Sequence, residues 1–207
     1  MDSFDNEVIV DEAVETVAEK RYTIKDFFEF LEIIVAAIVA TVVLFSFVFR
    51  VATIDGDSMQ STLFHGEKII ISNLFYTPKA NDIVVISRNI ENSSEASTNG
   101  NLPIIKRIIA TEGQTVDIDF EEGIVYVDGK ALSEPYTNTK TNLKYDIEFP
   151  VVVKEGCVFV LGDNRNFSLD SRSSQIGDNG MIDTRYILGR AVLRVLPFSK
   201  FGGLKNE

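Results

Sequence analysis

The apolar residues of the chain form one long uninterrupted run and, after it, several short ones. The long run covers the 17 residues 33–49 (IIVAAIVATVVLFSFVF), with no charged residue between Glu32 and Arg50. As a helix it would extend about 26 Å, near the short end of what crosses a bilayer core of about 30 Å. Because the run is apolar on all faces, it favours a transmembrane helix over an amphipathic core helix.

The residues around this run argue that it is retained and predict its orientation. Ten acidic and three basic side chains precede it, unlike the short basic leader of a cleaved export signal, and no Ala-x-Ala pattern follows it. Lys20, Arg21 and Lys25 lie close to its N-terminal side, against Arg50 alone on the other side. The positive-inside rule therefore predicts a cytoplasmic N-terminus, with residues 51–207 on the outer side of the cell membrane.

The short runs beyond the anchor predict β-strands. Apolar, β-branched stretches alternate with turn signals, and no segment after residue 55 has a sustained helical period. The predicted strands of the main region include residues 68–72, 82–86, 104–109, 157–161 and 191–196. The chain is therefore predicted to be mainly β, with an antiparallel region following a single N-terminal transmembrane helix.

A smaller β subdomain is predicted as an insert in this region. Val116, Ile118 and Phe120 alternate with acidic residues, as in a half-exposed strand, and residues 124–127 run into Asp128-Gly129, a strong tight-turn signal. The predicted organisation has five parts: an acidic tail (1–30), a transmembrane helix (31–50), a β region (51–117 and 156–198), an inserted β subdomain (118–155) and a C-terminal tail (199–207). A polar surface loop (89–101) is expected within the β region.

Composition excludes several classes of function. The net charge is −11, much of it in the N-terminal tail, and no basic patch is dense enough to follow a phosphate backbone, so we expect no nucleic-acid partner. The chain has one cysteine, Cys157, and one histidine, His65, which excludes an intrachain disulfide and a Cys-rich zinc site. We expect neither a metal nor a cofactor.

Three segments carry candidate chemistry. Gly56-Asp57-Ser58-Met59 is a glycine turn that can present a serine hydroxyl beside backbone N–H groups, although Gly-Asp-Ser is also ordinary turn chemistry. Lys106 lies in an apolar strand, where burial could lower its pKa enough for it to act as a base; the alternative is a lysine that reaches solvent at a strand edge. The third segment, 162–172, is a dense polar cluster that requires a satisfied hydrogen-bond network if it is buried.

Together these segments resemble the type I signal peptidases, from the anchor to the C-terminal region. Residues 56–63 (GDSMQSTL) look like the family's nucleophile box, and 81–85 (NDIVV) are similar to its next strand. Residues 106–109 (KRII), followed by 112–114 (EGQ), match the box that carries the base. The segment 162–172, Gly-Asp-Asn-Arg-x-x-Ser-x-Asp-Ser-Arg, is the longest and most specific match.

The resemblance implies a Ser/Lys serine endopeptidase that removes signal peptides from exported preproteins. Its partners would be these preproteins, membrane lipid and the protein-export machinery. It implies that Ser58 is the nucleophile, with its own N–H on the oxyanion, that Lys106 is the general base, and that Ser168 orients the lysine amine. Asp170 and Arg172 would form a supporting ion pair. Arg107 and Asp163 would be structural neighbours, and Met59 would lie beside the nucleophile near the membrane surface.

Two positions depart from the family pattern. The nucleophile box usually has proline where this chain has Ser61, which loosens a turn next to the nucleophile. Some members carry an oxyanion hydroxyl two residues before the nucleophile, where this chain has Gly56.

Two other functions remain open at this stage. A sortase-like cysteine transpeptidase would use Cys157 and His65, but it leaves Ser58 and Lys106 unexplained. A membrane-anchored extracellular β-domain with only a binding role explains the anchor and the strands, but not the cluster at 162–172.

Overall fold

The computed structural model describes residues 24–87 and 103–204. The predicted polar loop at 89–101 and most of the predicted acidic tail lie outside the described residues, as do residues 205–207. Two units are distinguished, residues 1–45 and 46–207, and each is described by itself.

The N-terminal unit is described by one helix, α2 (Ile24–Val48), of 25 residues. It begins nine residues before the apolar run at residue 33, because Phe27, Phe28 and Phe30 continue the apolar sequence toward the N-terminus. Most apolar side chains of α2 are exposed, and Thr41 Oγ1 donates to the Ala37 carbonyl (2.7 Å) within the helix. Judged on the described residues, no helix has the combination of length and apolarity that crossing a membrane demands.

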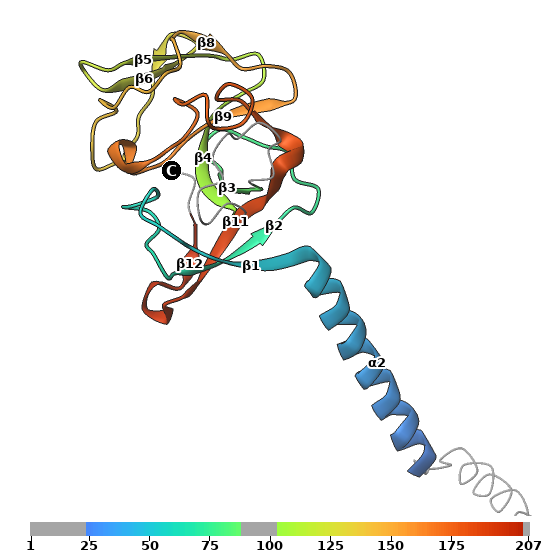
Figure 1. The fold of residues 1–207 in the computed structure, drawn as a ribbon. Coiled ribbons are helices and arrows are strands. Elements are labelled where there is room, and N and C mark those ends of the chain that lie inside the picture. Colours follow the sequence, from blue (N-terminus) through green and yellow to red (C-terminus); the bar gives the residue numbers. More distant parts are fainter. Residues whose placement is uncertain (1–23, 88–102, 205–207) are drawn as a thin grey trace, which may run out of the picture. The chain divides into compact units, whose positions relative to one another are not determined.

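The second unit is built from antiparallel β-sheets, which confirms the predicted mainly β architecture. Eight strands of the described residues form the first sheet, all paired antiparallel (Figure 1). In spatial order they are β1 (Phe49–Thr53), β2 (Lys68–Ser72), β11 (Ile187–Leu196), β3 (Ile83–Ile86), β4 (Ile104–Thr111), β9 (Cys157–Leu161) and β10 (Ile182–Asp183), with β12 (Gly202–Gly203) paired to β11.

The long strand β11 has a central place in this sheet. The hairpin of β1 and β2 and the pair of β3 and β4 are not neighbours of each other; β11 lies between β2 and β3 and hydrogen-bonds to both. A strand from the C-terminal part of the chain thus joins two β-pairs from its N-terminal part.

A second sheet of four strands occupies the position of the predicted insert. Its order is β7 (Lys130–Ala131), β6 (Ile124–Val127), β5 (Thr115–Asp119) and β8 (Val151–Val152). The side chains of β5 alternate between buried and exposed, as their apolar and acidic residues predict. Asp128 and Gly129 both have positive φ in the tight turn between β6 and β7, which is the conformation that Asp-Gly turns favour.

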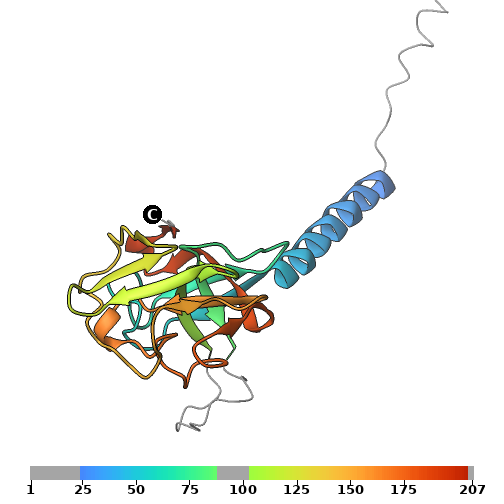
Figure 2. The ribbon, with the colours of Figure 1, turned by 90° about the horizontal axis from the view of Figure 1, so that it is seen from above.

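An apolar core connects the two sheets. Ile109 and Phe159 of the first sheet share one buried cluster with Val116 and Val125 of the second. Figure 1 shows the second sheet beyond β9, at the end of the first sheet opposite β1, and Figure 2 shows the same body from above. Short 3-10 helices, η1 (Arg165–Phe167), η2 (Thr184–Tyr186) and η3 (Phe198–Lys200), complete the unit. The predicted C-terminal tail (199–207) therefore includes most of η3 and all of β12.

Candidate active site

The turn that carries Ser58 follows strand β1 and is held by its apolar neighbours. Met59 and Leu63 are buried in a core cluster of the first sheet, and the N–H groups of Thr62 and Leu63 both donate to the Met59 carbonyl. Gly56 has a φ of 86°, a conformation that side chains rarely adopt, and this bends the chain just before the serine. Ser58 is left half-buried at the surface of the core.

The base candidate lies directly beside this serine. Lys106 is on β4, paired with Val84 of β3, and its side chain is 4% exposed. Its Nζ donates to Ser58 Oγ at 2.9 Å and to the carbonyl of Ile105 at 3.1 Å. The structure therefore brings together two residues that are 48 positions apart in the chain.

The polar cluster at 162–172 packs against the same turn. Asn164 N–H donates to the Ser58 carbonyl (3.0 Å), and the Asn164 side-chain amide donates to the Asp57 carbonyl (3.0 Å). Gly162 lies so close that a Cβ on it would be 2.2 Å from Ser168 Oγ and 2.5 Å from the Ser58 carbonyl oxygen. The hydroxyl of Ser168 is buried and has no hydrogen-bond partner among the described residues.

Asp170 and Arg172 form an ion pair with no solvent exposure. Arg172 Nε lies 2.8 Å from Asp170 Oδ1 and its Nη2 lies 2.9 Å from Oδ2, a bidentate contact. Asp170 Oδ2 also accepts from the N–H of Gly162 (3.0 Å). Because a buried charge is costly without its partners, this pair fixes the loop that contains Ser168.

Arg107 and Asp163 form a second buried pair beside the first, and each is 1% exposed. Arg107 Nε and Nη2 donate to Asp163 Oδ1 (2.8 Å) and Oδ2 (2.7 Å), and Nη1 donates to the Asn81 carbonyl (2.9 Å). The hydroxyl of Thr62 donates to Asp163 as well. The pair thus links β4, next to Lys106, to the turn after Ser58.

Several residues of this site have no role in the sequence-based prediction. Arg165, inside the recognised motif, is buried against Glu134. The ring of Tyr136 stacks on the guanidinium of Arg107, 3.9 Å from centroid to Cζ, and its burial, together with the Glu134 carboxylate, raises the pKa of the Tyr136 hydroxyl. Tyr145 donates to the Ser168 carbonyl. The segment that supplies Glu134 and both tyrosines has no strand or helix pattern that could have placed it here.

The residues of the cysteine-based alternative have other neighbours. His65 Nδ1 accepts from the Gly56 N–H (3.2 Å) and lies 3.3 Å from Asp55 Oδ1 at the surface. Cys157 lies on β9, paired with Asp183 of β10, and burial, together with the Asp183 carboxylate, raises the pKa of its thiol. Neither set of contacts includes the other residue.

A cavity of about 380 Å³ opens next to the strand that carries the lysine. Its lining is mainly apolar and comes from β1, β2, β3, β4 and β11 and from two residues just outside β1 and β4. The lining residues are Arg50, Val51, Ala52, Thr53, Asp55, Ile71, Val85, Pro103, Ile105 and Leu188. Ile105 in this lining precedes Lys106 on β4, and its carbonyl accepts a hydrogen bond from Lys106 Nζ.

Comparison with known proteins gives a consistent result. The family model described as "Signal peptidase, peptidase S26" matches residues 27–196. A signal peptidase I of Bacillus licheniformis is 31% identical over 183 residues, covering 84% of this chain and 90% of that protein. A probable signal peptidase I-1 of Synechocystis sp. is 34% identical over 179 residues, covering 85% of this chain and 86% of that protein. A crystal structure of a signal peptidase I from Enterococcus faecalis V583 is 28% identical, covers 56% of this chain and 97% of its own, and has a TM-score of 0.39.

Proposed function

Since the chain belongs to the signal peptidase family, peptidase S26, we propose that it cuts preproteins with Ser58 as nucleophile and Lys106 as general base. The chain is a signal peptidase I, a hydrolase that removes signal peptides from preproteins. The single observation that carries the catalytic assignment is the 2.9 Å contact between Lys106 Nζ and Ser58 Oγ. This distance lies within the hydrogen-bond reach that a base needs for the proton it takes.

The reaction runs in two halves. The neutral amine of Lys106 accepts the Ser58 proton as Oγ bonds to the scissile carbonyl carbon, and the proton then passes to the leaving amine of the mature protein as the C–N bond breaks. Water next adds to the acyl-enzyme ester and gives a proton to Lys106, which passes it to Ser58 Oγ as the ester C–O bond breaks, so that the signal peptide leaves with a free carboxyl group and both residues return to their starting state. Burial of Lys106 favours the neutral amine that both halves require.

The neighbouring residues position this pair. The Ser58 N–H would stabilise the oxyanion, and the hydroxyl of Ser168 would orient the Lys106 amine. The ion pairs Asp170–Arg172 and Arg107–Asp163 hold the loop and the strand on which these groups lie. Met59, the residue after Ser58, is buried in the core and so holds the nucleophile turn in place.

The substrate would bind as an extended strand, with one side chain near the cut bond in the cavity lined by Ile105, Val85 and Ala52. The mainly apolar lining of this cavity suits an uncharged side chain.

We place the enzyme at the cell membrane, anchored through residues 31–50 with the N-terminus in the cytoplasm and the β unit outside. The exposed apolar side chains of α2 support this attachment, and membrane lipid and the export machinery are the partners that it implies. Alkaline extraction of membranes tests the attachment, and protease accessibility from the outer face tests the orientation.

Cleavage of a preprotein with an Ala-x-Ala site tests the catalytic assignment. Ser58→Ala and Lys106→Ala should both fold and both lose cleavage. Lys106→Arg should be equally inactive, because arginine keeps the positive charge but cannot supply a neutral base. Normal cleavage by any of the three variants would refute the assignment. A binding module would not respond to these changes, and a sortase-like enzyme would instead depend on Cys157.

A further inference from the structure

The segment of residues 134–147, which we term the clamp segment, joins strand β7 to strand β8 of the second sheet. It contains no helix and no strand. Even so, it contacts three buried arginines that lie around the proposed catalytic pair: Arg107, Arg165 and Arg172. Each contact reaches a different part of the site.

The first end of the clamp segment meets the nucleophile turn and the base strand. Ser61, three residues after Ser58, donates its hydroxyl to the Tyr136 carbonyl (3.1 Å). The ring of Tyr136 covers the guanidinium of Arg107, the residue after Lys106. Tyr136 thus contacts both the turn that follows Ser58 and the arginine that follows Lys106.

Arg165 is bound by Glu134, the first residue of the clamp segment, and by Thr141 in its middle. Glu134 accepts from both Nη atoms of this arginine, with 2.8 Å between Nη1 and Oε2, and the hydroxyl of Thr141 accepts from Nη1 at 2.7 Å. Arg165 Nε in turn donates to the carbonyl of Gly162 (3.1 Å). These contacts tie the segment to the glycine that packs between Ser58 and Ser168.

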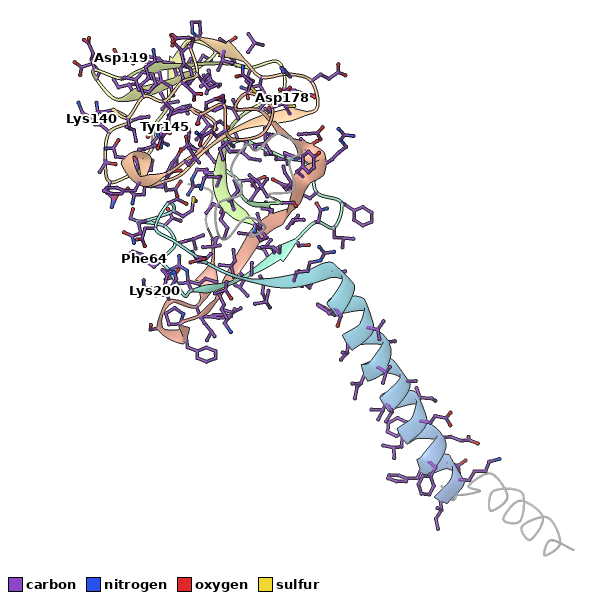
Figure 3. All side chains as sticks on the ribbon, viewed as in Figure 1. Phe64, Asp119, Lys140, Tyr145, Asp178 and Lys200 are labelled. Carbon is purple, nitrogen blue, oxygen red and sulfur yellow. The ribbon has the colours of Figure 1, made fainter. Side chains whose placement is uncertain are left out.

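The second end of the clamp segment holds the loop of Ser168. Arg172 Nη1 donates to the Leu143 carbonyl (2.8 Å), and the Ile147 N–H donates to the Arg172 carbonyl (3.1 Å). The Tyr145 hydroxyl donates to the carbonyl of Ser168 (3.2 Å), and its ring lies 5.4 Å from the Arg172 guanidinium. Figure 3 labels Tyr145 between the second sheet and the loop of η1.

We propose that the clamp segment positions the Ser58–Lys106 pair, and that Tyr145 is the positioning residue through which it fixes Ser168. The inference rests on the proposed function of Ser58, Lys106 and Ser168. Its physical basis is that the Ser168 hydroxyl has no hydrogen bond of its own among the described residues. No side-chain hydrogen bond to a described residue therefore holds Ser168, and its place depends on the backbone of its turn. The carbonyl of that residue accepts from the Tyr145 hydroxyl and from Arg172 Nη2, the arginine that the clamp segment also contacts.

Tyr145 is suited to this role at neutral pH. Burial raises the pKa of its hydroxyl above the ordinary value, so it remains an O–H donor throughout the working range. Substitution by phenylalanine keeps the ring beside Arg172 and removes only the donor.

The test compares Tyr145→Phe with Tyr126→Phe, which removes a half-buried hydroxyl from β6 of the same subdomain. We expect kcat for a signal-peptide substrate to fall about 3- to 10-fold in Tyr145→Phe, the range for one lost hydrogen bond. KM and the melting temperature should stay at the values of Tyr126→Phe. The acid limb of the kcat–pH profile should also differ from that of Tyr126→Phe, because Ser168 is proposed to orient the Lys106 amine that acts as base.

A double variant separates positioning from general structure. If Tyr145 acts through Ser168, adding Tyr145→Phe to Ser168→Ala should cause no further loss of kcat. Equal losses in both backgrounds, an unchanged kcat, or a fall in melting temperature that accounts for the lost activity would each overturn the inference. Ser58→Ala is measured beside these variants. Cleavage by Ser58→Ala would show that the catalytic assignment has failed, whereas an inactive Ser58→Ala with a fully active Tyr145→Phe would overturn the clamp inference alone.

Discussion

Gly162 has a specific steric role, which Gly162→Ala tests. Its φ lies outside the left-handed region, so alanine costs little in backbone conformation, and the effect comes from the added methyl group alone. That group would lie 2.2 Å from Ser168 Oγ and 2.5 Å from the Ser58 carbonyl oxygen. To reach ordinary contact at about 3.4 Å, these atoms must move by about 1.2 and 0.9 Å respectively, if each moves directly away.

Displacements of this size matter more for catalysis than for stability. Overpacking of a filled site typically costs about 1–3 kcal/mol of folding free energy. Misplacement of a catalytic group by about 1 Å can lower the rate about 100-fold. Gly162→Ala should therefore remain folded, with a modestly lower melting temperature and a kcat reduced by about two orders of magnitude.

The assay measures kcat on a preprotein with an Ala-x-Ala site, beside the thermal unfolding midpoint. Gly202→Ala on β12 is the matched control, because a Cβ at Gly202 meets no atom within 4 Å. A Gly162→Ala enzyme with the kcat of Gly202→Ala would refute the steric reasoning, since the methyl group would then have been absorbed without moving Ser58 or Ser168.

Three further changes probe other parts of the site. Arg107→Met leaves the Asp163 carboxylate buried without its guanidinium, and urea unfolding should show a loss of about 3–5 kcal/mol; a loss under about 1 kcal/mol would mean that water replaces the partner. Ser61→Ala removes the donor to the Tyr136 carbonyl and should lower kcat only a few-fold, in the same cleavage assay; an effect as large as that of Gly162→Ala would contradict this ranking. Cys157→Ser should leave cleavage unchanged, and the raised pKa of the native thiol should make its alkylation slower than that of free cysteine near pH 8; inactivation by the substitution would revive the cysteine-based alternative.

The local sequence pattern was sufficient to predict most strands of the first sheet. Stretches such as residues 68–72 and 157–161 are β-branched and apolar because their side chains are buried in the sheet, and the structure has β2 and β9 there. The same reasoning placed Lys106 in an apolar strand, and the motif of residues 162–172 supplied the polar cluster. Ser58 and Lys106 could be named together only through the family resemblance, since spacing in the chain does not show that they touch.

The rest depends on tertiary contacts that have no local signal. Nothing in the residues around Glu134 or Tyr136 indicates that they cover Arg165 and Arg107, because irregular segments are held by side chains distant in sequence. The family resemblance named Asp170 as the partner of Arg172, but no pattern in the sequence named Glu134 as the partner of Arg165. The position of β11 between β2 and β3 could not be predicted either, because pairing between strands more than a hundred residues apart produces no periodic pattern in the sequence.

The central place of β11 has a consequence for when the protease becomes active. Ser58 lies in the loop that joins β1 to β2, and Lys106 lies on β4 in the β3–β4 pair. Among the strands that the structure describes, β11 is the one that pairs with both halves of the sheet. Residues 187–196 leave the ribosome long after both halves have been made. Until they insert, Ser58 and Lys106, the proposed nucleophile and base, belong to separate pairs of strands. Under the proposed assignment, the catalytic pair is therefore assembled only once β11, one of the last strands in the chain, has joined the sheet.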